Sequence, residues 1–536
     1  MALLLEMISA AVARHPEKPA VIQLSTEKPE EVSYGGLYAG ACRTAQSLSR
    51  MGLAPGARVV LMGGNSPQWA AACVGIHMAG FTVSGLDPEI TDEVLGNILP
   101  FLEPQAAVCD SSLTGRFKNS IPNIIELESI DLTPAQLEFK AKPIAGNQPF
   151  SIVFTSGSTS TPKGVMLSEK NLLHNIEILS VTGELMRPTD RLLNLLPLYH
   201  VYAFTVTLLT PLCVGATVIY PRSLKGKDIM NAARDQQCTI ILVVPRVLQA
   251  IHQRICSAVK EKSLLKRALF RLLLKIGSLG TGRGFRPGRF LLRQVHRDLR
   301  HLRFFASGGA RLDPDLHREL AAAGFRILEA YGLSETSPIV SLNTPKRPIP
   351  GSVGKAAAGV EIKIERTDPA LDDGEVMVRG PNVMMGYFRN PEATGEAIVD
   401  GWFRTGDLGR LDEHGNLFLT GRSKEVIVMS SGKNIYPDEI EKIYSKSKLI
   451  EEVCICRLEK ETREQLTAVV VPSSEARQGR SSASMYENIK SDIKNLNAVL
   501  PSYQRVNRVI IAGEPFPRTR LGKLKRYQIQ ESIKKE

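Results

Sequence analysis

Residues 1–420 alternate short apolar runs with segments whose apolar residues recur at helical spacing. The runs at residues 58–62 and 239–244 are typical of buried strands, and residues 68–80 carry the spacing of a helix. Strands that alternate with helices favour parallel sheets covered by helices. No internal repeat of about twenty to fifty residues is present, which argues against a solenoid. The sequence therefore predicts an α/β fold with a large N-terminal domain of parallel-rich sheets.

The pattern changes after Gly421. The rest of the chain predicts a small α+β domain closed by a helix and a basic tail. We place the N-terminal domain at residues 1–420, the domain boundary at 421–424 and the C-terminal domain, named the lid domain, at 425–536. Within the lid we expect a strand at 425–429, a helix at 437–444, strands at 452–457 and 465–471, and a flexible polar loop at 473–484.

Composition limits the class of protein more than its function. The chain has 536 residues, 43% hydrophobic and 23% charged, which is the balance of an ordinary globular enzyme. Its eight cysteines form no CxxC pair, which argues against a zinc ribbon or a redox dithiol. Cys454 and Cys456 alternate in an apolar run, so both are expected to pack on one face of a strand as reduced thiols. Buried, reduced thiols predict a cytoplasmic protein.

Two apolar segments raise the question of membrane insertion. The first fourteen residues lack a basic start and are interrupted by Glu6, so they predict an amphipathic helix instead of a secretion signal. No Asp, Glu, Lys or Arg stands between Arg191 and Arg222, a stretch long enough to span a bilayer. Prolines, a glycine and polar residues interrupt it, so we expect a strand, a turn, a buried helix and another strand. A membrane span is the alternative.

Positive charge is concentrated in one segment. Residues 260–303 hold thirteen Lys and Arg residues and two acidic residues, whereas the whole chain has a net charge of +12. Apolar clusters lie among these charges, so the segment suits an anionic membrane surface or an acidic protein partner. A solvated basic face without a partner is an equal alternative. Nucleic acid is not expected, because no nucleic-acid-binding module is recognised.

A run of hydroxyl residues and glycine follows the apolar strand predicted at residues 151–154. It reads TSGSTSTPKG and covers residues 155–164. Hydroxyls and backbone N–H groups after a strand form a nest for phosphate oxygens, and a lysine adds positive charge. The pattern is not a Walker A loop. A flexible loop is the alternative, but the closing Pro-Lys-Gly favours a phosphate site built from Thr155, Ser156, Gly157, Ser158, Thr159 and Lys163.

This decapeptide resembles the phosphate-loop signature of the adenylate-forming superfamily, which holds acyl-CoA synthetases, luciferases and the adenylation domains of peptide synthetases. Ser160 departs from the family's usual glycine, and it would be strained if the backbone there needs a positive φ. Further segments resemble the family's motifs in the same order over nearly the whole chain. They are LPLYH at 196–200, SGGA at 307–310, YGLSET at 331–336, GWFRTGDLG at 401–409, GRSK at 421–424 and PRTRLGKLK at 517–525.

The resemblance implies an acyl site beside a nucleotide site in the large domain. His200 and Gly308 would line the acyl tunnel. Glu335 would hold Mg²⁺, a hard cation that prefers oxygen ligands. Taken alone, each of these residues is typical of a packing residue, a tight turn or a surface carboxylate. The residues expected around ATP or AMP here are Gly309, Ala310, Tyr331, Gly332 and Ser334, with Tyr331 stacked on adenine.

The later motifs imply the ribose contacts, the hinge and the catalytic lysine. Asp407 and Arg422 would bind the ribose, because a fixed carboxylate suits a diol. Lys424 matches the family's hinge position, so the resemblance implies a hinge at residues 421–424 about which a mobile lid domain turns. Lys523 matches the catalytic lysine, although a lysine in a basic tail is usually only solubilising. The catalytic set implied is Lys163, Ser334, Glu335 and Lys523.

The chain is thus identified as a member of this superfamily, with ATP and Mg²⁺ as expected cofactors. The implied reaction joins a carboxylate to AMP, releases pyrophosphate and passes the acyl group to a thiol. Positive groups around the phosphates would stabilise the charged transition state. A catalytically silent AMP-binding or acyl-binding protein is the alternative from another class, and the presence of every key residue argues against it.

The substrate and the acceptor are narrower expectations. The chain resembles long-chain fatty acid members most closely, and in particular the synthetase half of bacterial acyl-acyl-carrier-protein synthetase/acyltransferases. The acceptor is expected to be an acyl carrier protein, because such carriers are acidic and residues 260–303 would attract them. Coenzyme A is the alternative acceptor. The same segment would otherwise hold this cytoplasmic enzyme at an anionic membrane, where fatty acids partition.

Overall fold

The computed structural model describes residues 3–142, 144, 148–155, 163–181, 184–260, 293–366, 372–428, 434–460, 463–478, 481–518 and 524–535. Contacts divide the chain into two compact units. The first unit comprises Met1–Ile362 and Val378–Phe403, and the second comprises Lys363–Met377 and Arg404–Glu536. The predicted hinge at residues 421–424 falls within the second unit and stays a prediction.

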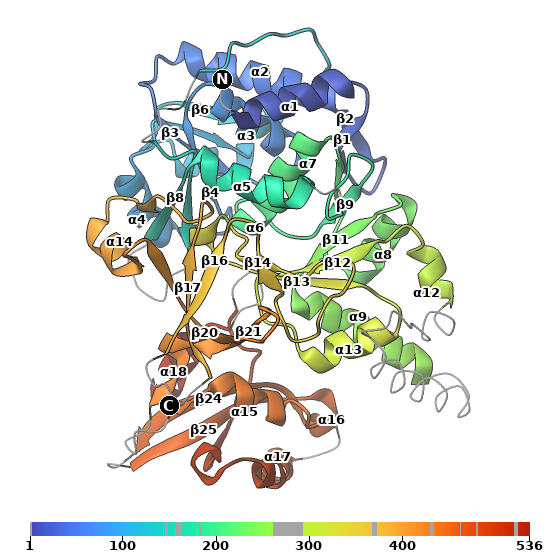
Figure 1. Ribbon diagram of the computed structural model, residues 1–536, viewed down its shortest axis with the longest axis vertical. Helices are drawn as coiled ribbons and strands as arrows, with labels where there is room; N and C mark the ends of the chain where they lie inside the picture. The colour runs from blue at the N-terminus through green and yellow to red at the C-terminus, as the bar shows by residue number, and fades with distance from the viewer. Residues whose placement is uncertain are drawn as a thin grey trace. The chain divides into compact units, whose positions relative to one another are not determined.

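A nine-stranded sheet runs through the first unit in the order β15-β14-β13-β12-β11-β9-β10-β1-β2. All neighbours from β13 to β1 are parallel, whereas β2, β14 and β15 add antiparallel edges. The expectation of parallel-rich sheets is therefore confirmed for this sheet (Figure 1). The strands are β1 Pro19–Gln23, β2 Glu30–Ser33, β9 Arg191–Asn194, β10 Thr217–Tyr220, β11 Ile240–Val243, β12 Phe304–Ser307, β13 Ile327–Tyr331, β14 Ser341–Leu342 and β15 Lys355–Ala356.

A seven-stranded sheet, in the order β18-β8-β7-β4-β3-β5-β6, also belongs to the first unit. Its pairs from β7 to β6 are parallel, and β8 pairs antiparallel with both β7 and β18. The strand predicted at residues 58–62 is β3. The strands are β3 Arg58–Met62, β4 Thr82–Leu86, β5 Ala106–Cys109, β6 Ile124–Glu126, β7 Ser151–Thr155, β8 Lys163–Leu167 and β18 Gly386–Tyr387.

Helices cover these sheets because their apolar residues gather on one face. Buried residues of α8, α9 and α13 join one face of the nine-stranded sheet in a single core, and α4 packs on the seven-stranded sheet (Figure 1). Helix α3 is buried on nearly all its surface, as expected for a helix that is apolar all round. The helices of this unit are α1 Leu3–Arg14, α2 Tyr34–Arg50, α3 Pro67–Met78, α4 Asp92–Leu102, α5 Glu169–Ser180, α6 Val201–Ala203, α7 Thr210–Val214, α8 Gly226–Asp235, α9 Pro245–Lys260, α12 Arg293–Asp298, α13 Pro314–Ala322 and α14 Pro391–Ala397.

The stretch between Arg191 and Arg222 forms part of the buried core. It comprises strand β9, a turn, the helical segment from α6 through the π-helical Phe204–Leu209 to α7, and strand β10. This is the predicted order of strand, turn, buried helix and strand. In the described part of the chain, no helix is long and apolar enough to cross a membrane. Residues 261–292, which make up most of the basic segment, lie outside the described residues.

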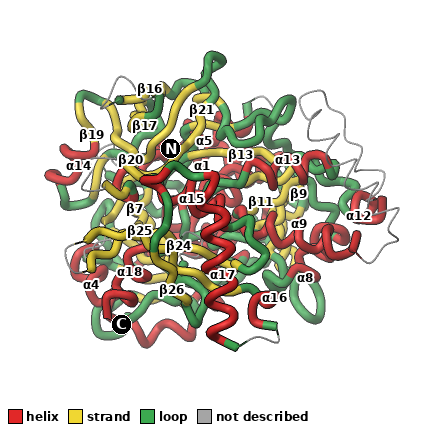
Figure 2. Tube along the Cα trace, turned by 90° about the horizontal axis from the view of Figure 1, so that it is seen from below, coloured by secondary structure: helices red, strands yellow, loops and turns green. Residues whose placement is uncertain are grey.

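The second unit contains a three-stranded sheet with helices on both faces. β24 (Ile450–Lys460) pairs antiparallel with β25 (Arg463–Pro472), which pairs parallel with β26 (Arg508–Ile511). Helices α15 (Pro437–Tyr444) and α17 (Ser482–Leu496) contribute to the core on one face, and α18 (Arg526–Lys535) to the core on the other (Figure 2). Cys454 and Cys456 are buried on the same face, as predicted.

A further sheet, in the order β16-β17-β20-β19 with β21 on β20, contributes residues to both units. Its strands are Glu361–Glu365 (β16), Gly374–Arg379 (β17), Ile398–Val399 (β19), Trp402–Leu411 (β20) and Leu417–Arg422 (β21). The boundary between the units passes through β16, β17 and β20.

Two predictions for the lid domain were wrong in detail. The strand expected at residues 425–429 is reduced to β22 (Ile427–Val428), which pairs with β23 (Asn434–Ile435), because residues 423–425 form a 3₁₀ turn. The polar loop expected at 473–484 contains α16 (Ser474–Arg477) and the start of α17. Ser473 and Ser481 cap these helices by accepting backbone N–H groups, which explains why polar residues do not prevent helix formation.

Candidate active site

Two paired strands fix the ends of the predicted phosphate loop. β7 and β8 place Thr155, the last residue of β7, opposite Lys163, the first residue of β8. Both side chains are half-buried. The loop between them lies outside the described residues, so the roles of its members stay predictions. These members are Ser156, Gly157, Ser158, Thr159 and Ser160.

Lys163 and Glu335 share a neighbour that the sequence did not single out. The Tyr387 hydroxyl donates to Glu335 Oε1 at 3.0 Å, and Lys163 Nζ lies 4.9 Å from the centroid of the Tyr387 ring. Burial and the adjacent Glu335 carboxylate raise the pKa of the Tyr387 hydroxyl, which therefore keeps its proton and remains a donor. The structure thus brings together two predicted site residues that are far apart in the sequence.

Ser334 and Glu335 lie in a 3₁₀ turn, Ser334–Thr336, shortly after strand β13. The Leu333 N–H donates to Thr336 Oγ1 at 2.9 Å, and that hydroxyl donates to the Pro338 carbonyl at 2.9 Å. The Glu335 carbonyl accepts the Met384 N–H at 2.8 Å. These bonds hold the turn from both sides, so the backbone that carries the two predicted site residues is fixed.

The predicted adenine loop and Tyr331 follow neighbouring parallel strands. β12 ends at Ser307 and β13 ends at Tyr331, so the residues after them emerge at the same edge of the sheet. Gly309 and Ala310 are exposed, and Tyr331 is buried. This is the edge of a parallel sheet at which ligands generally bind.

Two glycines of these loops are required by close approach of other groups. A Cβ at Gly332 would lie 1.5 Å from the Pro338 carbonyl oxygen, and a Cβ at Gly308 would lie 2.8 Å from the Tyr202 ring. Neither position accepts a side chain without displacement of its neighbours. Gly308 therefore packs directly against the Tyr202 ring. Tyr202 also lines an apolar pocket, so it joins the predicted adenine loop to that pocket.

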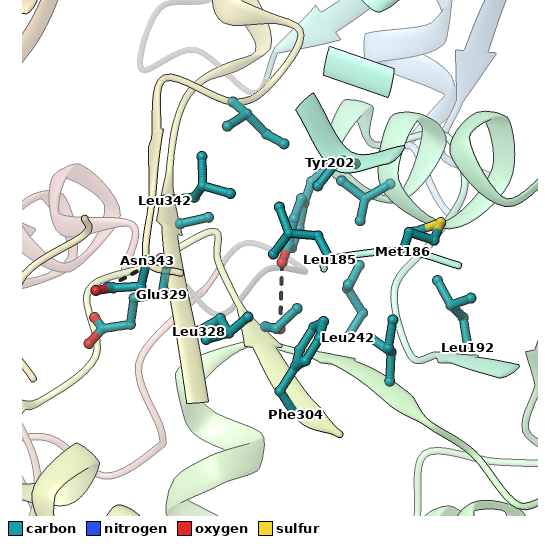
Figure 3. A pocket seen from close by; sticks show the side chains of 16 residues that line it. Leu185, Met186, Leu192, Tyr202, Leu242, Phe304, Leu328, Glu329, Leu342 and Asn343 are labelled. Carbon is teal, nitrogen blue, oxygen red and sulfur yellow. Dashed lines mark hydrogen bonds between the residues drawn. The ribbon is translucent and has the colours of Figure 1, made fainter. Parts of the chain in front are cut away.

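An apolar pocket lies against the nine-stranded sheet (Figure 3). Its walls are almost entirely aliphatic and aromatic, and the Tyr202 hydroxyl points towards the Ala306 carbonyl at 3.5 Å. Strands β9, β11, β12 and β13 form one wall, and α5 with the π-helical segment contributes to the other. Its lining includes Tyr202, Leu242, Ala306, Leu328 and Leu342.

The acyl-site prediction named His200 and Gly308, and neither lines this pocket. His200 immediately precedes α6, and its ring centroid lies 4.6 Å from that of Tyr199. Tyr202, two residues further on, lines the pocket instead. No sequence signal distinguished the pocket residues, because aliphatic residues in strands are typical of any core.

In the second unit, Asp407 and Arg422 form an ion pair, with Arg422 Nε 2.8 Å from Asp407 Oδ1. The Asp407 side chain is 7% exposed and that of Arg422 is 43% exposed. The Asp407 N–H donates to Thr405 Oγ1 at 3.0 Å, and that hydroxyl donates to the Val376 carbonyl at 2.7 Å. The carboxylate predicted to bind ribose is therefore rigidly held. Lys424, the predicted hinge residue, is exposed in the following 3₁₀ turn.

Lys523 lies outside the described residues, but the residues on either side of 519–523 are described. Arg518 and Leu524 form an isolated antiparallel β-bridge, and the Lys525 N–H donates to the Pro517 carbonyl at 2.9 Å. Arg518 Nη2 lies 3.1 Å from Glu452 Oε1 on β24. The described residues that flank 519–523 therefore lie close together on the small domain.

Arg526, three residues after Lys523, is the centre of a buried charge cluster. Its guanidinium pairs with Asp438 and Glu441 of α15 and lies 3.1 Å from Glu425 Oε2. Burial raises the pKa of Glu441 against the opposing effect of Arg526. Burial would lower the pKa of Arg526, but the charges of Glu441 and Asp438 raise it well above its ordinary value. The cluster ties the segment after the predicted hinge to the helix after the predicted catalytic lysine.

A metal at this site would depend on ligands from the substrate. Among the described residues, no group of three or more His, Cys, Asp or Glu side chains could hold a metal ion. Glu335 supplies one carboxylate, a hard oxygen ligand of the kind Mg²⁺ prefers. Mg²⁺ is commonly bound by one or two carboxylates together with substrate phosphates and water, so a single Glu335 fits that mode.

Comparisons with known proteins identify the family of the chain. A family model described as "AMP-binding enzyme" matches residues 8–388, and one described as "AMP-binding enzyme C-terminal domain" matches 424–536. A long-chain-fatty-acid–CoA ligase, FadD15, of Mycobacterium bovis is 31% identical over 433 residues, which cover 74% of this chain and 70% of that protein. An indoleacetate–CoA ligase of Aromatoleum aromaticum is 28% identical and covers 94% of this chain and 93% of its own. The crystal structure of an ATP-bound RpMatB-BxBclM chimera matches with a TM-score of 0.81, 26% identity and 99% coverage of both chains.

Proposed function

Because the chain belongs to the AMP-binding enzyme family, we propose that it activates a long-chain fatty acid with ATP and transfers the acyl group to coenzyme A. The observation that carries the choice of substrate is the apolar pocket beside the predicted adenine loop. Tyr202 lines that pocket and also supports Gly308 of the loop. An alkyl chain in the pocket would bury apolar surface at about 25 cal/mol per Å², which favours a fatty acid over a polar acid.

The acceptor in this proposal differs from the one that the sequence favoured. Acyl carrier protein was expected because residues 260–303 are basic, and most of that segment lies outside the described residues. Relatives such as the FadD15 ligase are named as CoA ligases, and this supports the coenzyme A alternative. We therefore take coenzyme A as the acceptor. Acyl carrier protein and an anionic membrane are not supported as partners.

The proposed first step brings two anions together, the fatty acid carboxylate and the phosphates of ATP. The fatty acid carboxylate attacks the α-phosphorus of ATP, forming acyl-AMP and releasing pyrophosphate. Lys163, Ser334 and the predicted Lys523 are assigned to the phosphate oxygens, where donors and positive charge stabilise the transition state. Glu335 is assigned to hold Mg²⁺, which would neutralise part of the phosphate charge when bound.

The proposed nucleotide contacts follow from the described geometry of each motif. Asp407 is assigned to the ribose hydroxyls, because Arg422 holds its carboxylate and the Thr405 hydroxyl accepts its backbone N–H. The loop after β12 and the end of β13 are assigned to adenine, because they share the ligand-binding edge of the sheet. In the second step, the thiol attacks the acyl carbonyl of the adenylate and AMP leaves. Lys424 is assigned as the hinge for that step.

A direct assay tests this proposal. The purified full chain would be incubated with ATP, Mg²⁺ and a saturated long-chain fatty acid, and with either coenzyme A or a holo acyl carrier protein. We expect pyrophosphate release in both mixtures and a thioester of the expected mass with coenzyme A. A thioester with the carrier protein alone would overturn the choice of acceptor. Nucleotide binding without pyrophosphate release would support the silent binding protein instead.

A further inference from the structure

Tyr387 contacts two residues of the proposed site because of where its strand pairs. β18 pairs antiparallel with β8, and Tyr387 is the register partner of Val165. Side chains two residues apart on a strand share a face, so Lys163 lies diagonally beside Tyr387 across the pair. The distance of 4.9 Å from Lys163 Nζ to the ring centroid is within the range of a cation–π contact.

The hydroxyl of the same side chain reaches Glu335. It donates to Oε1 at 3.0 Å, and the neighbouring Met384 N–H donates to the Glu335 carbonyl. The segment that carries Tyr387 thus holds Glu335 by both its side chain and its backbone. The Tyr387 side chain is 8% exposed, so little water competes for either contact. The Tyr387 N–H in turn donates to Thr394 Oγ1 at 2.9 Å, which anchors the strand to α14.

We propose that Tyr387 is a positioning residue for Mg²⁺-nucleotide binding, which acts by setting where Glu335 and Lys163 stand relative to each other. This inference rests on the proposed function. The ring places a cation at its face and a carboxylate at its edge, so the separation of these opposite charges is set by a rigid side chain. Glu335 is then held ready for the metal and Lys163 for a phosphate oxygen, without reorganisation when the nucleotide binds.

Two substitutions separate the contacts. Tyr387→Phe removes the hydroxyl and keeps the ring, so it affects Glu335 alone. Tyr387→Leu removes both contacts. Calorimetry of the full chain with a non-hydrolysable α,β-methylene analogue of ATP, across a series of Mg²⁺ concentrations, measures metal-dependent binding without turnover. We expect Tyr387→Phe to raise the Mg²⁺ concentration for half-maximal binding about tenfold, since a hydrogen bond to a charged group is lost. Its affinity for the analogue without Mg²⁺ should stay unchanged, whereas Tyr387→Leu should weaken both.

Tyr34→Phe is the matched control, because it removes another buried hydroxyl of the first unit, which lies within hydrogen-bonding distance of the Pro211 and Ala216 carbonyls. It should leave the Mg²⁺ titration unchanged. In a Glu335→Gln background, Tyr387→Phe should have no further effect on the titration. A Tyr387→Phe titration equal to that of the wild type, or an undiminished effect in the Glu335→Gln background, would overturn the inference. Failure of the wild-type chain to bind the Mg²⁺-analogue would instead overturn the proposed function.

Discussion

Asp407 and Arg422 are register partners on β20 and β21, and their side chains are joined by the ion pair described above. Cross-strand partners lie close together whatever their sequence separation, so the hairpin by itself creates this pair. The half-exposed guanidinium of Arg422 thus holds the nearly buried Asp407 carboxylate in one orientation. The motifs at 401–409 and 421–424, which are separate in the sequence, therefore meet in one β-hairpin.

Asp407→Asn should weaken ATP binding about ten- to hundredfold, because a charge-assisted hydrogen bond to a ribose hydroxyl is replaced by a neutral one. Calorimetry with ATP and with its 2′-deoxy and 3′-deoxy analogues measures the effect. The wild type should lose affinity for the deoxy analogues, and the variant should distinguish them from ATP much less. Asp373→Asn, which breaks the surface pair with Arg410, is the control and should change nothing. Unaltered discrimination in Asp407→Asn would refute the ribose assignment.

Lys523→Ala should abolish ATP–pyrophosphate exchange and spare thioester formation from supplied acyl-adenylate. The reason is that positive charge on the phosphates is needed only while pyrophosphate leaves. Lys525→Ala removes a nearby lysine of the same tail and should leave both half-reactions near the wild-type rate. Equal loss of both steps in Lys523→Ala would contradict the assignment of this lysine to adenylation.

The volume of the apolar pocket should set the preferred chain length. Ala306→Leu adds carbon to the pocket wall and should shift the preference towards shorter acids, whereas Leu342→Ala removes carbon and should shift it towards longer ones. Each methylene group of the fatty acid that can no longer be buried in the pocket costs about 0.8 kcal/mol of binding free energy, or roughly fourfold in kcat/KM. Competition between fatty acids of graded length, followed by mass measurement of the thioesters, gives the result. Identical length profiles for the two variants would show that the alkyl chain binds elsewhere.

Arg526→Gln should destabilise the second unit by about 3–5 kcal/mol, because it leaves the carboxylates of Glu425, Asp438 and Glu441 without their buried partner. Hydrogen exchange, read by peptide, locates the loss within residues 425–535 and measures its size. Arg410→Gln breaks a pair in which the arginine side chain is 49% exposed, and it should cost less than about 1 kcal/mol. Similar protection in Arg526→Gln and the wild type would mean that the cluster contributes little to stability.

The stability of the first unit should fall in mild acid because of His77. Burial lowers the pKa of this imidazole from 6.5 to about 3, and its ring stacks on Phe150. Between pH 6.5 and about 3, His77 is therefore protonated in the unfolded chain and neutral in the folded chain. The contribution of His77 is therefore present above pH 6.5 and is lost progressively as the pH falls towards 3, at about 1.4 kcal/mol per pH unit.

Denaturant unfolding at a series of pH values, compared with His77→Phe, checks this contribution. The variant keeps an aromatic ring against Phe150 and removes the titrating group, so the difference between the two proteins should grow as the pH falls below 6.5. His414→Phe is the control, because it replaces a surface histidine whose side chain is 73% exposed. A constant difference between the wild type and His77→Phe across this range would contradict the account.

Local pattern determined much of the secondary structure. Strand β3 and helix α15 have the predicted bounds, and the charge-free stretch after Arg191 folds in the predicted order. These segments were predictable because apolar periodicity and turn residues act over a few positions. The loop predicted at residues 473–484 was wrong because a local pattern there fits two structures. Ser473 and Ser481 are typical both of loops and of helix caps, and only their backbone partners distinguish the two.

The sequence by itself determined the family, the motif residues and the α/β class, because these depend on residue types at fixed short spacings. Tertiary structure alone decided that Tyr387 joins Lys163 to Glu335, that aliphatic residues of four strands enclose a pocket, and that Arg526 gathers Glu425, Asp438 and Glu441. Each of these features joins side chains that are distant in the chain and ordinary in type. Their contacts arise from strand order and helix packing, and no local pattern carries that information.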